Sequence, residues 1–159
     1  MRRPFAGVLA VLAACALALA ACAKDKPSTG APAGGAPTSV SLKVSQTRLG
    51  QVLTDGDGRT VYAFTQDEGG KSVCVGGCAE KWPPLAQQGQ PKAGDGVDAA
   101  LLGTIARDDG GTQLTYNKMP LYHFASDQSP GDVKGQAVGG VWFAVSAAGA
   151  LVKSPASRY

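Results

Sequence analysis

The sequence predicts an all-β fold, a small antiparallel-sheet domain of two pseudo-repeats that follows a signal peptide and a disordered linker. Three observations predict it. The 159 residues include 22 Gly and 10 Pro, and no long apolar helical run follows residue 22. Short runs of alternating apolar and polar side chains lie between turn-forming residues. Part of this pattern recurs sixty residues later in the chain.

The N-terminus is typical of an exported lipoprotein. Arg2 and Arg3 precede an apolar segment, 5–21, which is short for a membrane-spanning helix. Its end, Leu19-Ala20-Ala21-Cys22, resembles the bacterial signal known as the lipobox. The resemblance implies that residues 1–21 are removed and that Cys22 carries lipid on its sulfur, which would anchor the protein to a bacterial membrane.

Two alternatives to lipidation at Cys22 remain. Leu12-Ala13-Ala14-Cys15 matches the same short pattern, although cleavage there would leave an apolar region of only about eight residues. The other alternative is an ordinary secretory peptide in which Cys22 is incidental.

A tether and one folded domain follow the signal peptide. Residues 22–39 contain no large apolar side chain that could offset the entropy of ordering, so we expect a disordered linker. The domain is then 40–159, with its first repeat at about 42–98 and its second at about 99–159. The chain has 15 Lys and Arg and 12 Asp and Glu, and its basic residues stand singly. This balance gives no electrostatic case for a nucleic-acid partner.

In the first repeat, alternation over 40–44 predicts a half-buried strand. The runs 49–54 and 60–65 flank Asp55-Gly56-Asp57-Gly58, which predicts a hairpin because Gly readily adopts positive φ. A short helical turn is expected at Cys78 to Lys81, and the polar, Gly-rich segment 86–96 is expected to be a loop.

The same Asp-x-Asp-Gly sequence can open a calcium-binding loop of the EF-hand type. The pattern fails here, because Arg59 occupies the third ligand position and Gln66 the twelfth. We therefore expect a turn and not a calcium site.

In the second repeat, 101–105 and 113–116 flank another turn, Asp108-Asp109-Gly110-Gly111, and predict a hairpin. Pro120 opens the next predicted strand, 121–124, at a position that tolerates a missing N–H. A last hairpin is expected between 141–145 and 150–152.

The two halves share one motif. Each has Tyr-x-Phe-x-x-Asp, with a Trp 20 residues after the Tyr. The shared residues are Tyr62, Phe64, Asp67, Trp82, Tyr122, Phe124, Asp127 and Trp142. Two copies of one unit predict a pseudo-symmetric domain whose halves bury a common core.

The chain resembles the secreted-repeat bacterial lipoproteins defined by a Tyr-x-aromatic-x-x-Asp motif. The resemblance covers roughly 49–151 and rests on LTDGDGRTVYAFTQD, CVGGCAEKWPPL, LGTIARDDGGTQLTYNKMPLYHFASD and PGD followed by GGVWFAV. It implies an extracytoplasmic location and this architecture, but no defined activity. One departure is Lys118, where the family often has Gly. A side chain at positive φ costs about 1 kcal/mol, so the type of this turn stays open.

Cys74 and Cys78 are the cysteines of the domain. Because an exported protein occupies an oxidising compartment, we expect a structural disulfide. The alternative is a redox or copper site, since two thiolates with His123 or Met119 would suit Cu(I). Exported copper-delivery proteins have a similar C-x-x-x-C pair, but their thioredoxin-like fold needs helices that this sequence does not predict.

The motif aromatics are expected in the core, with a groove between the repeats as the alternative. Asp67 and Asp127 are expected to cap turns, and an acid–base pair of carboxylates is the alternative. No known nucleophile, phosphate-binding or His-rich motif is present.

The function expected from the sequence is therefore that of a membrane-anchored, non-enzymatic binding or scaffolding module without a cofactor. Its partner would be a protein or a small molecule. The rival expectation is a redox or copper-handling accessory of membrane electron transfer.

Overall fold

The computed structural model describes residues 39–153, and this part of the chain is all-β with one short helix, as predicted. The predicted signal peptide and the predicted lipidation site, Cys22, lie outside the described residues. Within 39–153, none of the helices is long and apolar enough to cross a membrane. The elements are β1 (Ser41–Thr47), β2 (Gly50–Asp55), β3 (Tyr62–Phe64), α1 (Gly77–Lys81), β4 (Lys92–Ala93), η1 (Ala99–Leu101), β5 (Leu102–Ala106), β6 (Thr112–Tyr116), β7 (Met119–Pro120), η2 (Val138–Gly140) and β8 (Trp142–Ala144).

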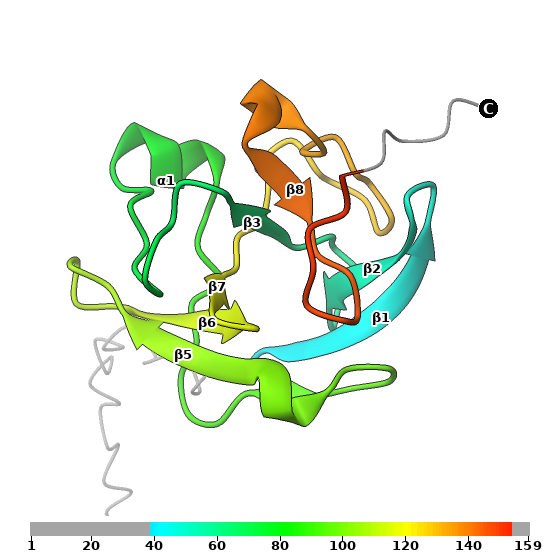
Figure 1. Ribbon diagram of the computed structural model, residues 1–159, viewed down its shortest axis with the longest axis horizontal. Coiled ribbons are helices and arrows are strands. Elements are labelled where there is room, and N and C mark those ends of the chain that lie inside the picture. Colours follow the sequence, from blue (N-terminus) through cyan, green and yellow to red (C-terminus); the bar gives the residue numbers. More distant parts are fainter. Residues whose placement is uncertain (1–38, 154–159) are drawn as a thin grey trace, which may run out of the picture. The chain divides into compact units, whose positions relative to one another are not determined.

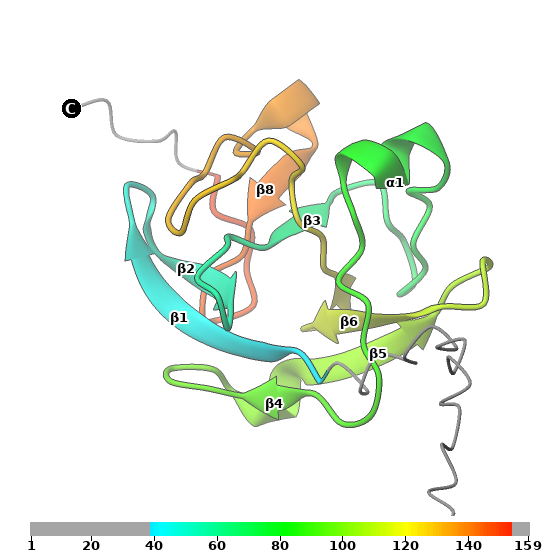
Figure 2. The same ribbon diagram turned by 180° about the vertical axis from the view of Figure 1, so that it is seen from behind.

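The strands form three small sheets, with the orders β2-β1-β4, β5-β6-β7 and β3-β8. In both views of the ribbon, the β1–β2 and β5–β6 hairpins lie on opposite sides of the lower part of the fold, and β3 and β8 lie above them (Figures 1 and 2). The β5–β6 hairpin is the one predicted around Asp108 to Gly111. The predicted helical turn is α1, which begins one residue before Cys78.

The first hairpin differs from the prediction. β2 pairs along its whole length with β1, from Leu42↔Asp55 to Thr47↔Gly50, and reaches the segment after the Asp55 turn only through the bridge Thr54↔Thr60. The reason is that the strand containing Tyr62, β3, pairs with β8 and not with β2.

The turn between β6 and β7 keeps a left-handed backbone although Lys118 replaces the usual Gly. Asn117 has φ 48° and Lys118 has φ 65°, the combination that a two-residue type I′ turn requires. The side chain at Lys118 therefore costs about 1 kcal/mol, which the rest of the fold offsets.

Each repeat supplies pairing partners for strands of the other repeat. β3 of the first repeat pairs with β8 of the second, with Tyr62 opposite Ala144. Sixty residues along, Tyr122 of the second repeat is bridged to Pro84 of the first. Tyr62 and Tyr122 also exchange backbone hydrogen bonds, each N–H lying 2.9 Å from the other's carbonyl. This reciprocal pattern is that of a pseudo-two-fold arrangement.

The same exchange explains three further differences from the prediction. The predicted strand 121–124 is replaced by β7, which lies just before it, and by isolated bridges at Tyr122. The bridges are isolated because the neighbours of Tyr122 are single segments of the other repeat. The predicted final hairpin is reduced to the bridge Val145↔Leu151, since β8 pairs with β3. The expected loop 86–96 contains β4, which runs parallel to the start of β1.

The core consists of two buried clusters. The first is mainly aliphatic and includes Leu42, Leu53, Val61, Leu85, Leu114, Leu121 and Val145. The second is mainly aromatic and includes Val52, Tyr62, Cys74, Trp82, Tyr122, Phe124 and Trp142. The second cluster contains most of the repeated motif.

Candidate functional site

The motif aromatics form one stack across the two repeats. Trp82 and Trp142 lie face to face at the centre, with ring centroids 3.9 Å apart and planes 2° apart. Phe64 stacks on the outer face of Trp142 at 4.2 Å, and Phe124 packs on Trp82 at 4.3 Å. Both indoles are at most 4% exposed. Both indoles therefore lie in the core and do not form the wall of an open groove, and Phe64 is partly buried against them.

The two tyrosines close the stack from the sides. Tyr62 meets Trp82 edge-on at 5.5 Å, and Tyr122 meets Trp142 edge-on at 5.1 Å. These are the edge-to-face contacts that aromatic rings favour. Each tyrosine thus touches the tryptophan that lies 20 residues after it in its own repeat.

The motif aspartates connect the two repeats, because each aspartate accepts a hydrogen bond from the tyrosine of the other repeat. Tyr62 donates its hydroxyl hydrogen bond to Asp127 at 2.6 Å, and Tyr122 donates to Asp67 at 2.7 Å. The other carboxylate oxygen accepts a backbone N–H, from Lys134 for Asp127 and from Val73 for Asp67. Each aspartate therefore ties down the loop that follows it, and both carboxylates are engaged in structural bonds.

Burial governs ionisation in these pairs. It raises the pKa of Tyr62, and the Asp127 carboxylate raises it further. Burial also raises the pKa of Asp67, although hydrogen bonds from Tyr122 and Val73 and the positive charge of Arg107 oppose the shift. Neither tyrosine hydroxyl is disposed to lose its proton at neutral pH.

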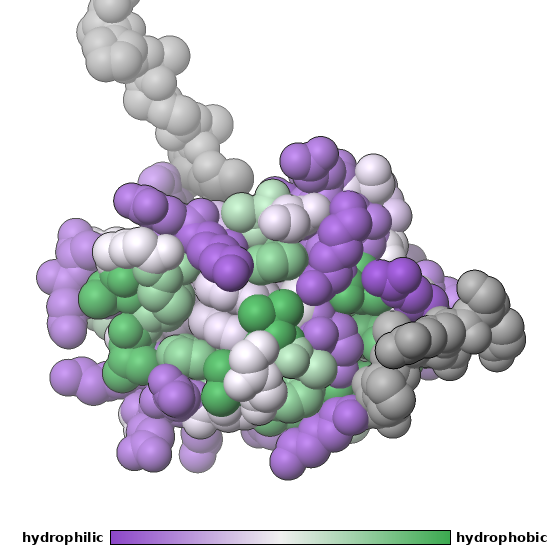
Figure 3. Space-filling model, turned by 90° about the horizontal axis from the view of Figure 1, so that it is seen from above, coloured by the Kyte–Doolittle hydropathy of each residue, from purple (hydrophilic) through white to green (hydrophobic). Residues whose placement is uncertain are grey.

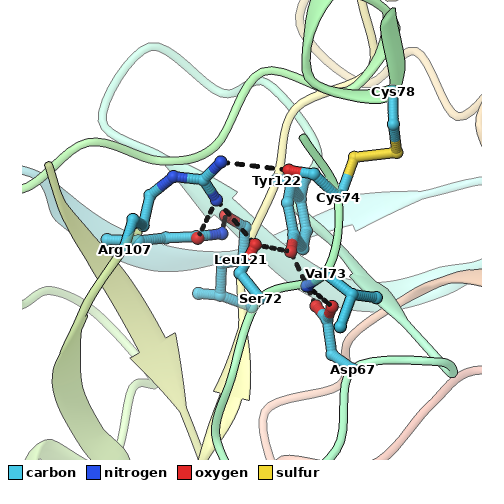
Figure 4. Close-up of a disulfide and its surroundings, with 9 residues drawn as sticks. Asp67, Ser72, Val73, Cys74, Cys78, Arg107, Leu121 and Tyr122 are labelled. Atoms are coloured by element: carbon cyan, nitrogen blue, oxygen red, sulfur yellow. Dashed lines mark hydrogen bonds between the residues drawn. A yellow bond between two sulfur atoms is a disulfide. The ribbon is translucent and has the colours of Figure 1, made fainter. Parts of the chain in front are cut away.

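The segment 72–78, which we name the cysteine loop, is the feature that most clearly distinguishes the first repeat. Cys74 and Cys78 form the predicted disulfide, with Cα atoms 5.2 Å apart (Figure 4). Sixty residues later, Lys134 and Val138 stand at the corresponding positions, so the second repeat has no such bond.

A buried arginine holds the cysteine loop in place (Figure 4). Arg107 is 8% exposed and follows β5 directly. It donates to Ser72 Oγ at 2.6 Å, to the Cys74 carbonyl at 3.0 Å and to Gln113 Oε1 at 2.7 Å. Ser72 in turn lies 2.7 Å from the Tyr122 hydroxyl. The loop is therefore connected through Tyr122 to the motif itself.

Sequence reasoning missed Arg107. It stands singly beside the Asp108 to Gly111 turn, where an arginine is usually solvated. The only sequence signal was its place two residues after the predicted strand 101–105 and two before Asp109, which it contacts at 3.0 Å.

The cysteine loop presents apolar side chains to solvent. Val73 is 53% exposed and Val75 is 55% exposed, and they are the large apolar residues left most open in the described chain. Cys74 between them is fully buried. The face above α1 and β8 also shows apolar patches among charged side chains (Figure 3).

His123 and Met119 do not join the cysteines in the structure. His123 Nε2 lies 2.8 Å from Asp55 Oδ2, although without the alignment of a good hydrogen bond. Met119 pairs with Tyr116 and packs on the aliphatic cluster. Within residues 39–153, no group of three or more His, Cys, Asp and Glu side chains could hold a metal ion.

The Asp55 turn is likewise a structural turn. Asp55 Oδ1 accepts the N–H groups of Asp57 and Arg59 at 3.0 and 2.9 Å. With Oδ2 on His123, its carboxylate is committed to protein partners. A cavity of about 400 Å³ opens beside this turn and His123.

Comparison with known proteins agrees with the repeated architecture. A family described as a secreted repeat of unknown function matches residues 43–86 and again 103–146. No curated protein and no solved structure matches the chain. The two matches cover more than half of the chain and correspond to the two halves that exchange strands. The chain therefore belongs to this family of secreted repeats, which places it outside the cytoplasm.

Proposed function

We propose that the protein is a lipid-anchored binding module that presents the cysteine loop to an extracytoplasmic protein partner. One observation carries the proposal. A loop with two exposed valines is held by a disulfide, by Arg107 and by the Asp67 carboxylate.

Rigidity is what supports a binding role for this loop. A partner that covers Val73 and Val75 would remove apolar surface from water at about 25 cal/mol per Å². Because the loop is already ordered, little of that gain would be lost to conformational entropy. The buried Cys74 and the hydrogen bond that the Val73 N–H donates to Asp67 keep the two valines in fixed directions.

The asymmetry of the repeats supports the same role. Both halves contribute to the aromatic stack and to the tyrosine–aspartate bonds. The disulfide and the arginine contacts occur on one half only and are added to that common core. A feature that one repeat has and the other lacks is not required by the common fold, and it is therefore a candidate for recognition.

Anchoring is the second part of the proposal. Lipid on Cys22 would hold the protein at a membrane, and each buried CH₂ of an acyl chain contributes about 0.8 kcal/mol. The tether would give the domain a reach on the order of 20–25 Å. The loop could then meet a partner in the same membrane or in the layer above it.

Site-specific photo-crosslinking in intact cells tests the binding role. A photoreactive amino acid placed at Val75 is expected to give a discrete cross-linked species. The same amino acid at Arg48, which is exposed in the turn between β1 and β2 on the opposite side of the ribbon from α1 (Figure 1), serves as the matched control and is expected to give none. Cys74→Ser with Cys78→Ser should weaken the Val75 adduct, because the valines lose their fixed directions. Equal labelling from both positions would contradict the proposal.

A further inference from the structure

The pseudo-symmetry exposes one difference between equivalent strands. β1 and β5 open the two repeats, and the outer edge of β1 is covered by the segment 90–95. Lys92 N–H donates to the Val40 carbonyl at 3.2 Å and Gly94 N–H to the Leu42 carbonyl at 2.7 Å. Val44 N–H then donates to the Asp95 carbonyl at 2.9 Å. β1 therefore binds an extended segment in parallel along this edge.

The corresponding edge of β5 is open from the Leu102 carbonyl onward, since the Leu102 N–H donates to the Ala99 carbonyl. β5 is the outermost strand of the β5-β6-β7 sheet. Leu102 and Thr104 stand where Leu42 and Val44 stand in the first repeat. Their backbone groups point away from β6, because β6 is hydrogen-bonded through Gly103 and Ile105. Within the described residues, neither the N–H of Thr104 nor the carbonyl of Leu102 has a backbone partner on this edge.

The edge also lacks the usual protection against pairing. Native edge strands commonly carry charged residues or proline that block another strand. Leu102–Ala106 has neither, since its sequence is LGTIA. Beside it lies a cavity of about 380 Å³, whose lining includes Gly69, Gly70, Thr104, Ile105 and Lys118. An added strand could therefore place a side chain in that cavity.

We infer that the outer edge of β5 binds an extended, glycine-containing segment of a partner protein, added parallel to the strand as β4 is added to β1. Glycine is required opposite the Leu102 carbonyl. At the equivalent place, a Cβ on Gly94 would lie 2.7 Å from the Leu42 carbonyl oxygen. Lys118 at the cavity favours an acidic side chain in the same segment.

A peptide segment fits this edge better than a second copy of the chain. Pairing of β5 with another β5 would join only five residues from each chain. Stable dimers commonly bury about 1,200–2,000 Å² in total, which such a short pair of strands does not supply. This inference rests on the β5 edge and is independent of the cysteine loop.

The chain supplies its own probe for the test, a synthetic peptide with the sequence of residues 89–96, GQPKAGDG. Titration into the full chain, followed by amide NMR, is expected to shift Leu102–Ala106 and to slow hydrogen exchange at Thr104. A peptide with Gly94→Ala should bind about tenfold more weakly or worse, because its methyl group meets the strand carbonyl.

A protein variant gives a second control. Thr104→Pro removes one edge donor at a position where proline is tolerated, and it is expected to weaken the peptide about tenfold. Thr104→Val keeps the N–H and should bind within about twofold of wild type.

Three results would overturn the inference. They are unchanged β5 amides at millimolar peptide, equal binding of the Gly94→Ala peptide, and shifts confined to β1, where the peptide would be replacing β4. Shifts in β5 that depend on protein concentration without peptide would instead identify a second copy as the occupant.

Discussion

At the scale of single residues, the carboxylates differ by what surrounds them. Asp67 is held by Tyr122 and by a backbone N–H, yet burial dominates and raises its pKa. Burial acts on Asp55 as well. There the close contact with His123 and the N–H groups of Arg59 and Asp57 outweigh it, so the pKa of Asp55 is lowered.

These opposite shifts predict opposite effects of pH on stability. A lowered pKa stabilises the fold above the usual value of 3.8, and that contribution is lost as pH falls through the folded value. A raised pKa means that the folded state holds the proton more tightly, so stability falls as pH rises through the folded value.

Urea unfolding of Asp55→Asn and Asp67→Asn at about pH 2 and about pH 6 measures both effects. The stability lost through Asp55→Asn is expected to be larger at the higher pH. The stability lost through Asp67→Asn is expected to be smaller at the higher pH. If the stability lost by the two variants changed in the same direction between the two pH values, the environments of these carboxylates would not differ in this way.

At the scale of elements, the cysteine loop shows how a short segment is fixed by bonds of different kinds. The disulfide closes a ring of five residues, which restricts the unfolded chain by about 2 kcal/mol. Arg107 acts on the folded state, because its guanidinium satisfies the Cys74 carbonyl, Ser72 and Gln113. Removing it leaves several buried groups without a partner.

We therefore predict that Arg107→Lys destabilises the protein more than loss of the disulfide. Cys74→Ser with Cys78→Ser should cost about 2 kcal/mol. Arg107→Lys should cost on the order of 3 kcal/mol, since a lysine cannot reproduce the planar set of donors. The exposed Arg48→Lys is the matched control, expected within about 0.5 kcal/mol of wild type. Chemical denaturation measures all three, and an Arg107→Lys value equal to the control would refute the role given to this residue.

At the scale of the whole molecule, neither repeat is complete by itself. β3 has its partner in β8, and the Tyr122 segment has its partner at Pro84. The central contact of the aromatic stack joins Trp82 of one repeat to Trp142 of the other. The two halves should therefore fold as one cooperative unit.

Separated halves test this dependence. The fragments 39–98 and 99–159 are each expected to be unfolded, because each would expose half of the aromatic stack and an unpaired tyrosine strand. An equimolar mixture should regain the near-ultraviolet circular dichroism of packed tryptophans. The control is the same mixture with Trp142→Ala in the second fragment, which should not regain it. A fragment that folds alone would contradict mutual completion.

The sequence by itself determined those features that depend on neighbouring residues. Alternation and turn residues predicted the all-β class and the β5–β6 hairpin, while the oxidising compartment of an exported chain predicted the disulfide. The recurring motif predicted two halves with a common aromatic core, and the family match agrees with it.

Only the tertiary structure decided which strands pair and what holds the cysteine loop. Tyr62 pairs with Ala144, and Arg107 reaches Cys74, across separations at which a local pattern carries no information. Reading the Tyr62 strand with its nearest neighbour in sequence therefore placed it in the wrong hairpin. The physical reason is that a strand takes the partner that buries its ring side chains, and in this protein that partner belongs to the other repeat.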